Sequence, residues 1–439
     1  MFPALAAAQS QPEWKQVMER LSRLEEQNRE LMTELRSLRK QLTPPTGEVV
    51  ADDGGAATTK AEIGERLAIQ ETRVAELQQT KVESERRLPL KLTGTLLFNA
   101  YLNGRSGAGQ NPVLASTGST SAVGGASFRQ TVLGLKFTGP TVLGGAKVTG
   151  SVFMDFFGGS GGPLNQQMRL RVATVDFAWS HTTFSVGQDK PIIAPREPDS
   201  LAQVGISPLT DAGNLWLWQP QARVEQRFEF GSTTGLRAQV GVYQTSESGT
   251  GLAAEYGDRL TAARPGLEGR FEFWKQFGES RRIELAPGFH VSDTHVAGVT
   301  APSRIYSIDW LIRPVSWFDL TGMFFEGENV SGLGSLRQSV TSFPDDTFRS
   351  VRAYGGWAQA SFRANRRLTF NLYGGQQDDR NQDLLKGGIG KNQMYAINAI
   401  YRLGSNVLTS IEASQVRTTY LGLGTRLNPH YDLAIAYLF

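Results

Sequence analysis

The chain has 439 residues, no cysteine and a formal net charge of +3, from 45 basic and 42 acidic residues. The absence of cysteine excludes disulfides, a cysteine-based zinc site, a thiol nucleophile and a lipid anchor on an N-terminal cysteine. The nearly balanced charge gives no electrostatic reason to expect a nucleic-acid partner. The mean hydropathy of −0.28 does not separate a soluble protein from one that crosses a membrane with alternating strands.

The first residues of the chain look like the end of a targeting segment. The tripeptide Ala6-Ala7-Ala8 fits the small-residue cleavage site of a secretory signal peptide. We therefore expect residues 1–12 to be the remnant of a signal peptide or a disordered terminus. An ordinary alanine-rich N-terminus is the alternative.

Residues 13–43 are predicted to form one helix of a coiled coil. From Trp14 onward, core positions recur with alternating spacings of three and four, and charged residues fill the positions between them. This heptad pattern leaves a narrow apolar stripe that one helix cannot bury, so it predicts association with helices of other chains. A lone amphipathic helix packed on the base of the following domain is the alternative. The seam consists of Val17, Leu21, Leu24, Asn28, Leu31, Leu35, Leu38 and Leu42.

A linker and a second helix are predicted between this coiled coil and the rest of the chain. Pro44 and Pro45 end the first helix, and residues 44–61 read as a linker. A weaker apolar stripe predicts a second helix over 62–88. From residue 89 to 439 the composition shifts to Gly, Phe, Val, Thr and Tyr with singly spaced charges, which indicates a separate all-β domain.

About 16 antiparallel strands are predicted in this second domain. The strand-like runs are 89–103, 127–139, 143–157, 168–179, 182–188, 220–230, 234–244, 265–277, 281–292, 304–314, 316–327, 351–363, 366–377, 392–403, 406–418 and 428–439. Tight turns are expected at Gly139–Val142, Ser180–His181, Gly231–Thr233, Gly278–Ser280, Pro314–Val315, Ala364–Asn365 and Gly404–Ser405. They alternate with long connections at 104–126, 158–167, 189–219, 245–264, 293–303, 328–350, 378–391 and 419–427.

Alternation of short and long connections is typical of a transmembrane β-barrel, which has short periplasmic turns and longer external loops. A soluble β-sandwich has no reason to alternate its loops in this way. An even number of strands returns both ends of the barrel to the periplasmic side.

Single strands also alternate as a barrel wall should. Val224 and Phe228 share one face, while Glu225 lies on the other; the last strand places Tyr431, Leu433, Ile435, Tyr437 and Phe439 on one face. The run 168–179, with Arg169 and Arg171, does not alternate cleanly and is interpreted as part of a subunit interface. Aromatic residues near strand ends fit an interfacial girdle: Trp179, Trp274, Phe277, Trp317, Tyr401 and Tyr437.

The terminal Phe439, preceded by alternating apolar residues, resembles the C-terminal signature by which the barrel assembly machinery recognises outer-membrane proteins. The whole chain resembles bacterial porins. A coiled coil ahead of about 16 strands is similar to the DcaP-like family, with phosphate-selective porins as relatives. The resemblance covers architecture over residues 89–439 and the helical arm, and no substrate-binding motif matches residue by residue. It implies a homotrimer in the outer membrane, joined through barrel walls and periplasmic coiled coils.

The third external connection, 189–219, is the longest and is the segment that narrows the lumen in trimeric porins. It holds four prolines between 189 and 208, which fix φ and restrict their predecessors, and a constriction needs such rigidity. An ordinary surface loop packing Trp216 and Trp218 is the alternative. The candidate constriction residues are Lys190, Arg196, Glu197 and Asp199.

Strand parity predicts charged side chains of both signs on the lumen wall. Because arginines and glutamates occur as near neighbours, many are expected to pair across strands, and the residues by themselves favour neither anions nor cations. The predicted wall residues are Arg223, Arg227, Arg237, Arg270, Arg282, Glu225, Glu268 and Glu272.

No catalytic, cofactor or metal motif is found. The four histidines are scattered, and Gly387–Lys391 lacks the first glycine and the β-α context of a phosphate loop. The favoured function is a porin for passive or substrate-selective diffusion of small hydrophilic solutes, with outer-membrane lipid around it and no enzymatic activity. The alternative is a structural protein whose coiled coil ties the outer membrane to the cell wall or to a periplasmic partner.

Overall fold

The computed structural model describes residues 90–439 apart from 108, 119–120, 143, 160–165, 253–255, 257–264, 297, 337 and 346. The predicted signal remnant, coiled coil, linker and second helix fall in residues 1–89 and lie outside the described residues. The chain divides into two compact units, Met1–Arg86 and Arg87–Phe439. Within the described part of the chain no helix has the length and apolar composition to cross a membrane.

Antiparallel strands make up most of the second unit. In chain order the elements are β1 Leu90–Asn103, β2 Val123–Ser127, β3 Val132–Val142, β4 Ala146–Gly158, β5 Gln167–Ala178, β6 Thr182–Asp189, β7 Gln219–Glu229, β8 Thr234–Gln244, β9 Gly249–Thr250, β10 Pro265–Phe277, β11 Arg281–Val296, β12 Val299–Val315, β13 Phe318–Glu328, the 3-10 turn η2 Ser331–Leu333, β14 Val340–Ser342, β15 Phe348–Ser350, β16 Arg352–Arg363, β17 Leu368–Asp379, the 3-10 turn η3 Asn381–Asp383, β18 Ile389–Arg402, β19 Val407–Tyr420 and β20 Gly424–Leu438.

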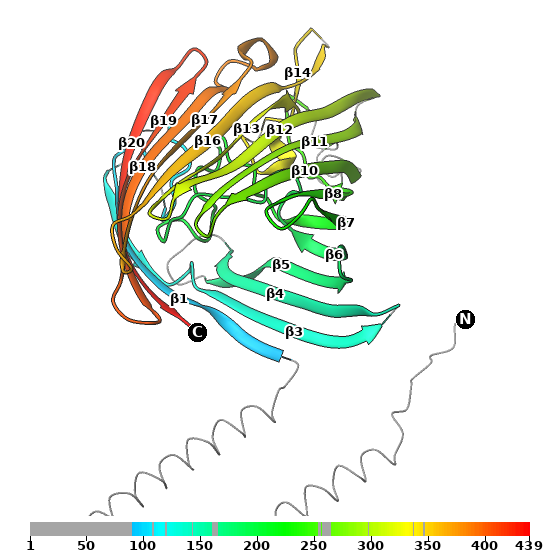
Figure 1. The fold of residues 1–439 in the computed structure, drawn as a ribbon. Coiled ribbons are helices and arrows are strands. Elements are labelled where there is room, and N and C mark those ends of the chain that lie inside the picture. The colour runs from blue at the N-terminus through cyan, green and yellow to red at the C-terminus, as the bar shows by residue number, and fades with distance from the viewer. Residues whose placement is uncertain are drawn as a thin grey trace, which may run out of the picture. The chain divides into compact units, whose positions relative to one another are not determined.

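The strands close into a barrel of 16 antiparallel strands, as the sequence predicted (Figure 1). Strands β2 and β3 occupy one position in the ring, because β2 pairs with the second half of β1 and β3 with the first half. The ring closes where β1 pairs with β20 from Thr95↔Leu438 to Asn103↔His430. The short strands β9, β14 and β15 form a separate sheet among the long loops.

The C-terminal Phe439 completes this closure. Its backbone N–H donates to the carbonyl oxygen of Gly94 (3.2 Å), and the N–H of Gly94 donates to the carbonyl oxygen of Phe439 (3.0 Å). A Cβ atom at residue 94 would lie 2.8 Å from the Phe439 ring, so glycine is needed where the terminal ring crosses β1. Phe439 therefore lies at the end of the barrel that carries the short turns.

Two predicted turns and two predicted long loops are wrong. β12 runs through Pro314 and Val315 with a register shift against β13 between Ile312 and Val315, so the turn lies at 316–317. β3 continues through Gly139 and Pro140 with a register shift between Thr138 and Thr141, because a bulge tolerates a proline that cannot donate to the ladder. The reversal follows at Gly144 and Gly145, whose φ values of 68° and 90° favour glycine. The predicted loops 293–303 and 419–427 are mostly strand, since β11 and β12 extend to 296 and 299, and β19 and β20 to 420 and 424.

The imperfect alternation in β5 has a local cause. Its pairing with β4 skips Arg171, because Phe153 faces Val172 and Met154 faces Leu170. Such a bulge reverses the side to which the following residues point. Arg169 and Arg171 point into the barrel, where both pair with Asp155; the position of this strand at a subunit interface stays a prediction.

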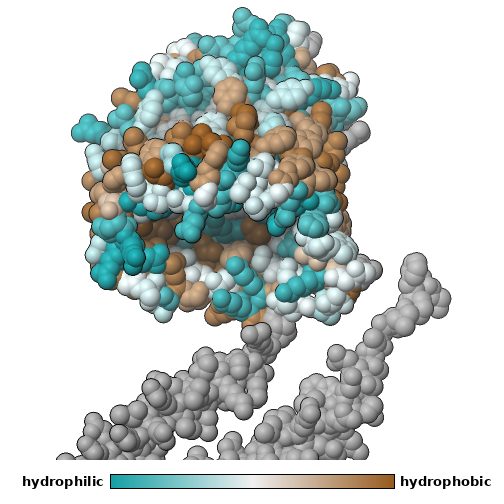
Figure 2. All heavy atoms as spheres, viewed as in Figure 1, coloured by the Kyte–Doolittle hydropathy of each residue, from teal (hydrophilic) through white to brown (hydrophobic). Residues whose placement is uncertain are grey.

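The outer wall is apolar and the inner wall is mostly polar. On β20, Tyr431, Leu433 and Ile435 are exposed on the outside, whereas the intervening Asp432 and Ala434 are buried inside. Of the predicted girdle aromatics, Trp274 instead faces the lumen, where Arg282 lies over its ring. The others are on the outside at the short-turn end. The space-filling view shows a hollow in the barrel bordered by hydrophilic and hydrophobic side chains (Figure 2).

Candidate functional site: the segment inside the barrel

The segment 190–218 between β6 and β7 lies in the lumen. It enters along β10, where the N–H of Ile192 donates to Glu268 Oε2 (2.7 Å). Ile192 and Ile193 are buried. The segment is therefore held to the inner wall from its first residues, and the surface-loop alternative is wrong.

Glu268 belongs to a buried row of three side chains. Its Oε1 lies 2.9 Å from His290 Nδ1, and His290 Nε2 lies 3.3 Å from Ser292 Oγ. The order of the groups is that of a hydrolytic triad, but the second carboxylate oxygen already accepts from Ile192. All three side chains are buried against neighbouring strands. Their visible role is to anchor the segment.

Arg196 makes the densest set of ion pairs in the segment. Its Nε donates to Asp309 Oδ1 on β12 (2.8 Å), and its Nη2 donates to Glu272 Oε2 on β10 (3.2 Å) and to Glu284 on β11. A planar guanidinium can reach several carboxylates at once because its donors diverge in one plane. Arg270 also pairs with Asp309 and Glu272. Arg196 thus joins the segment to three adjacent strands.

Lys190 and Glu197 pair within the segment. Lys190 Nζ lies 2.7 Å from Glu197 Oε1, and Ser207 Oγ donates to Glu197 Oε2 (2.6 Å). Burial acts to raise the pKa of Glu197, but the charge of Lys190 and the hydrogen bonds from Lys190 and Ser207 outweigh it and hold this pKa below its ordinary value. Glu197 therefore keeps its charge inside the barrel.

Asp199 is held on the opposite wall. Its backbone N–H donates to Gln359 Oε1 and its Oδ2 accepts from Gln359 Nε2, both at 2.7 Å. Burial raises the pKa of Asp199. The next residue, Ser200, donates through Oγ to Glu412 Oε2 on β19 (2.6 Å).

The segment then crosses to the first strands of the barrel. The carbonyl oxygen of Leu201 accepts from Asn99 on β1 (2.9 Å), and that of Val204 accepts from Arg171 on β5 (2.8 Å). Farther along, the carbonyl oxygen of Asp211 accepts from Asn392 on β18 (2.9 Å). Contacts with strands on so many sides of one ring are possible only from within the lumen.

An apolar cluster fixes the later part of the segment. Leu209, Ala212 and Leu215 are buried against inward-facing side chains of the wall, among them Phe325 and Trp357. An apolar patch on the inside of a barrel requires an apolar partner, because water would otherwise contact it. The segment therefore covers the apolar side of the lumen wall and leaves the charged side open to the lumen.

That charged side includes a cluster which the sequence did not identify. Asp155 on β4 accepts from Arg169 (2.7 Å) and pairs with Arg171 (3.4 Å). The two guanidinium groups lie over the Trp218 ring at 5.3 and 4.5 Å, which adds cation–π attraction. Strand parity could not assign them because of the bulge in β5.

Most of the predicted wall residues form ion pairs, but only some of these pairs cross between strands: Arg227 with Glu225 and Arg282 with Glu284 pair within one strand. Arg223 pairs with Asp189 (3.0 Å), Arg227 with Glu225 (2.9 Å), and Arg237 with Glu272 (2.6 Å); Arg282 pairs with Glu284. Arg270 is fully buried behind the segment. No group of three or more metal-ligating side chains suited to an ion occurs among the described residues.

Comparison with known proteins gives fold relatives only. No family model and no curated protein matches the sequence. The barrel is similar to the outer membrane channel DcaP of Acinetobacter baumannii, with 17% identity, a TM-score of 0.64, and 80% of this chain and 97% of that chain covered. It is also similar to an anion-selective porin from Comamonas acidovorans (12%, TM-score 0.54, 80% and 99% covered). Salmonella typhi OmpF in complex with daunomycin is a third (12%, TM-score 0.52, 80% and 97% covered). At these identities the likeness establishes a porin-type barrel fold.

Proposed function

We propose that the protein is an outer-membrane porin that lets small hydrophilic solutes diffuse through a water-filled lumen. The observation that carries the proposal is the segment 190–218, which is pinned to the inner wall by Ile192, Arg196 and Asp199. A loop that narrows a barrel without filling it sets pore diameter and lining charge. Lys190, Arg196, Glu197 and Asp199 are the proposed constriction residues.

The outer wall supports a position in a membrane. Exposed aromatic residues lie at both ends of an apolar band, with Phe277, Trp317 and Tyr437 toward the short turns and Tyr306 and Tyr395 toward the long loops. Two aromatic girdles around an apolar band are typical of outer-membrane barrels. In this orientation the short turns and Phe439 face the periplasm, where the barrel assembly machinery would read the C-terminal residue.

The lumen charges favour anions. In most of the ion pairs around the lumen the carboxylate is buried behind a more exposed arginine: the side chains of Arg169 and Asp155 are 30% and 0% exposed, and those of Arg237 and Glu272 are 30% and 4% exposed. A passing ion therefore meets guanidinium groups first. The exceptions are the pairs of Lys190 with Glu197, of Arg223 with Asp189, and of the fully buried Arg270 with its two carboxylates, in which the acid is the more exposed partner. Although acidic and basic side chains both occur in the lumen wall, the side chains that it exposes are therefore mainly basic.

The oligomeric state in the proposal is a homotrimer. It rests on the resemblance to trimeric porins and on the heptad seam from Val17 to Leu42, which needs partner helices. The helical arm would then lie in the periplasm beneath the barrels.

Liposome swelling tests whether solutes pass. Liposomes that contain the purified chain should swell in an isotonic solution of a small neutral sugar, and faster in a carboxylate anion of the same size. The expected difference follows from the exposed arginines. Liposomes that remain as tight as protein-free ones with both solutes would refute the porin proposal.

A further inference from the structure

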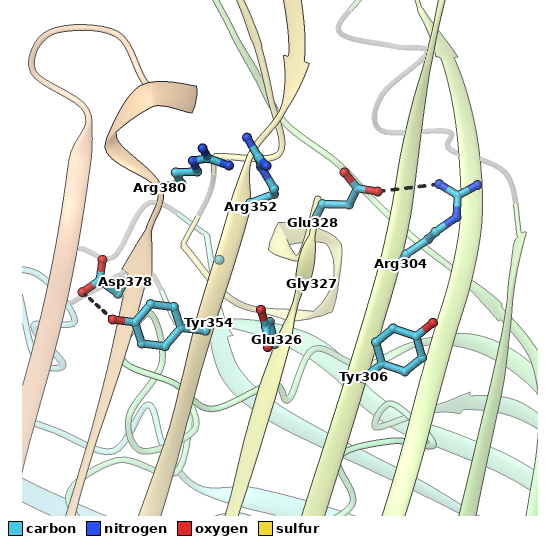
Figure 3. A pocket seen from close by; sticks show the side chains of 10 residues that line it. Arg304, Tyr306, Glu326, Gly327, Glu328, Arg352, Tyr354, Asp378 and Arg380 are labelled. Carbon is cyan, nitrogen blue, oxygen red and sulfur yellow. Dashed lines mark hydrogen bonds and ion pairs between the residues drawn. The ribbon is translucent and has the colours of Figure 1, made fainter.

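A charged patch interrupts the apolar outer wall near the long loops. On β12, β13 and β16, Arg304, Glu328 and Arg352 stand directly opposite one another, and the N–H of Arg380 donates to the carbonyl oxygen of Arg352 (2.8 Å). The side chains point outward over an open groove of about 640 Å³ (Figure 3). A lipid-facing wall does not need three arginines in one row, so the patch calls for a ligand.

The arginines of this row are only partly engaged by the protein. Arg304 lies 3.4 Å from Asp293 and 3.6 Å from Glu328, both long for ion pairs, while Arg352 pairs with the buried Asp383 at 3.1 Å. The Arg304 and Arg352 side chains remain 49% and 50% exposed. Each guanidinium has five N–H donors, so both keep donors directed to the outside.

The row below the arginines is aromatic and acidic. Tyr306 is 72% exposed, and Tyr354 donates through its hydroxyl to Asp378 (3.2 Å). Lys391 neutralises Asp378 at 3.0 Å. Glu326 faces Tyr306 and Tyr354 across the strands and would repel an anion placed at this depth. An anionic group is thereby restricted to the arginine row at the rim.

A second groove of about 400 Å³ continues from Tyr354 toward the middle of the wall. Its floor is made of Gly356, Ala358 and Gly374, and its sides include Trp310 and Tyr395. In register, Ala358 and Gly374 lie side by side on β16 and β17, and the Trp310 ring borders them where it covers Gly322. Because Ala358 and Gly374 have little or no side chain, they leave a furrow in an otherwise filled wall.

We propose that the two grooves together bind one phosphorylated, acylated glycolipid of the outer leaflet. Its phosphate lies against Arg304, Arg352 and Arg380, and one acyl chain lies in the furrow. Arginine matches phosphate because its donors form a planar fork, and the exposed Tyr306 ring offers a flat face to a sugar. The inference rests on the proposed membrane orientation, which places the arginine row at the depth of outer-leaflet headgroups.

Native mass spectrometry of the purified full chain in detergent, titrated with lipid A, tests the proposal. The combined variant Arg304→Gln, Arg352→Gln and Arg380→Gln should weaken lipid A binding at least tenfold, and Ala358→Leu, which fills the furrow, should weaken it several-fold. Arg417→Gln is the matched control, since Arg417 is an exposed residue near the same end of the barrel on β19, outside the grooves. Heat-modified migration on gels verifies that each variant folds.

Several outcomes would overturn the proposal. One is lipid A binding that is unchanged in both groove variants, and another is equal binding of phosphatidylglycerol, which has phosphate and acyl chains but no sugar. A change in oligomer mass without a change in lipid binding would make the patch a contact between copies. Channel steps in a planar bilayer, recorded on the same samples, test the porin proposal separately. If the chain gives no channel steps but still binds lipid A, only the porin proposal is refuted.

Discussion

Replacing Arg196 should loosen the segment inside the barrel. In the wild type its guanidinium contacts Asp309, Glu272 and Glu284 from three strands. In Arg196→Gln each carboxylate keeps another arginine: Arg270 for Asp309, Arg237 for Glu272 and Arg282 for Glu284. The loss should therefore lie below the roughly 3–5 kcal/mol typical of breaking a buried pair. It should be near the ~2 kcal/mol of hydrogen bonds to charged groups.

A change of that size alters the ratio of docked to released segment by about 30-fold. Single-channel recording in planar bilayers should show a larger and noisier conductance for Arg196→Gln. Arg196→Lys keeps the positive charge but loses the planar set of guanidinium donors. Its conductance should therefore be as noisy as that of Arg196→Gln, while its ion preference should change less. Arg227→Gln is the control, because its side chain is 60% exposed and pairs with Glu225, away from the segment. Conductance and noise equal to wild type in Arg196→Gln would refute the anchoring role.

Three further sets of substitutions test the lumen charges, the pair of Lys190 with Glu197, and the helical arm. Asp155→Asn removes the carboxylate that Arg169 and Arg171 share. The reversal potential in a salt gradient should therefore shift further toward anions, and the free energy of unfolding should fall by about 3 kcal/mol. An unchanged reversal potential would contradict the proposal that exposed arginines make the lumen anion-selective. Because the pKa of Glu197 is held below its ordinary 4.5, its stabilising effect is complete above pH 4.5 and is lost as pH falls through the lowered pKa. Glu197→Gln should therefore lower the unfolding midpoint at pH 7 and progressively less as the pH falls below 4.5, and a loss that does not change with pH would count against the pair with Lys190. Substituting Leu24, Leu31 and Leu35 with Asp should reduce oligomer mass on a native gel, and an unchanged mass would mean that the arm does not join the subunits.

The strand pattern could be predicted because period-two alternation survives in nearly every strand. β8 and β10 match their predicted ranges at both ends. The predicted turns fail where a proline lies in a bulge of a strand, and the predicted loops fail where polar residues continue along a strand. Thr294 is buried inside β11 while Asp293 points outward, and the four successive polar residues from Ser292 to His295 indicate a loop from sequence alone.

The candidate site was predictable only in part. Prolines and length identified the segment, and parity identified Arg237 and Glu272 as lumen residues. Neither signal could pair Arg196 with Asp309, because that contact joins residues 113 positions apart. The bulge at Arg171 also defeats parity for the rest of β5. The exposure of each charged side chain decides whether the lumen surface is mainly positive or negative. This exposure depends on packing, so it could not be predicted from the amino-acid composition.

Ion current through a planar bilayer containing the purified full chain, recorded in a KCl gradient, tests the central proposal most directly. An anion-selective porin should give discrete conductance steps and a reversal potential of the sign set by chloride. No steps at any voltage would contradict the channel, and a potassium-selective reversal potential would contradict the anion preference assigned to the exposed lumen arginines.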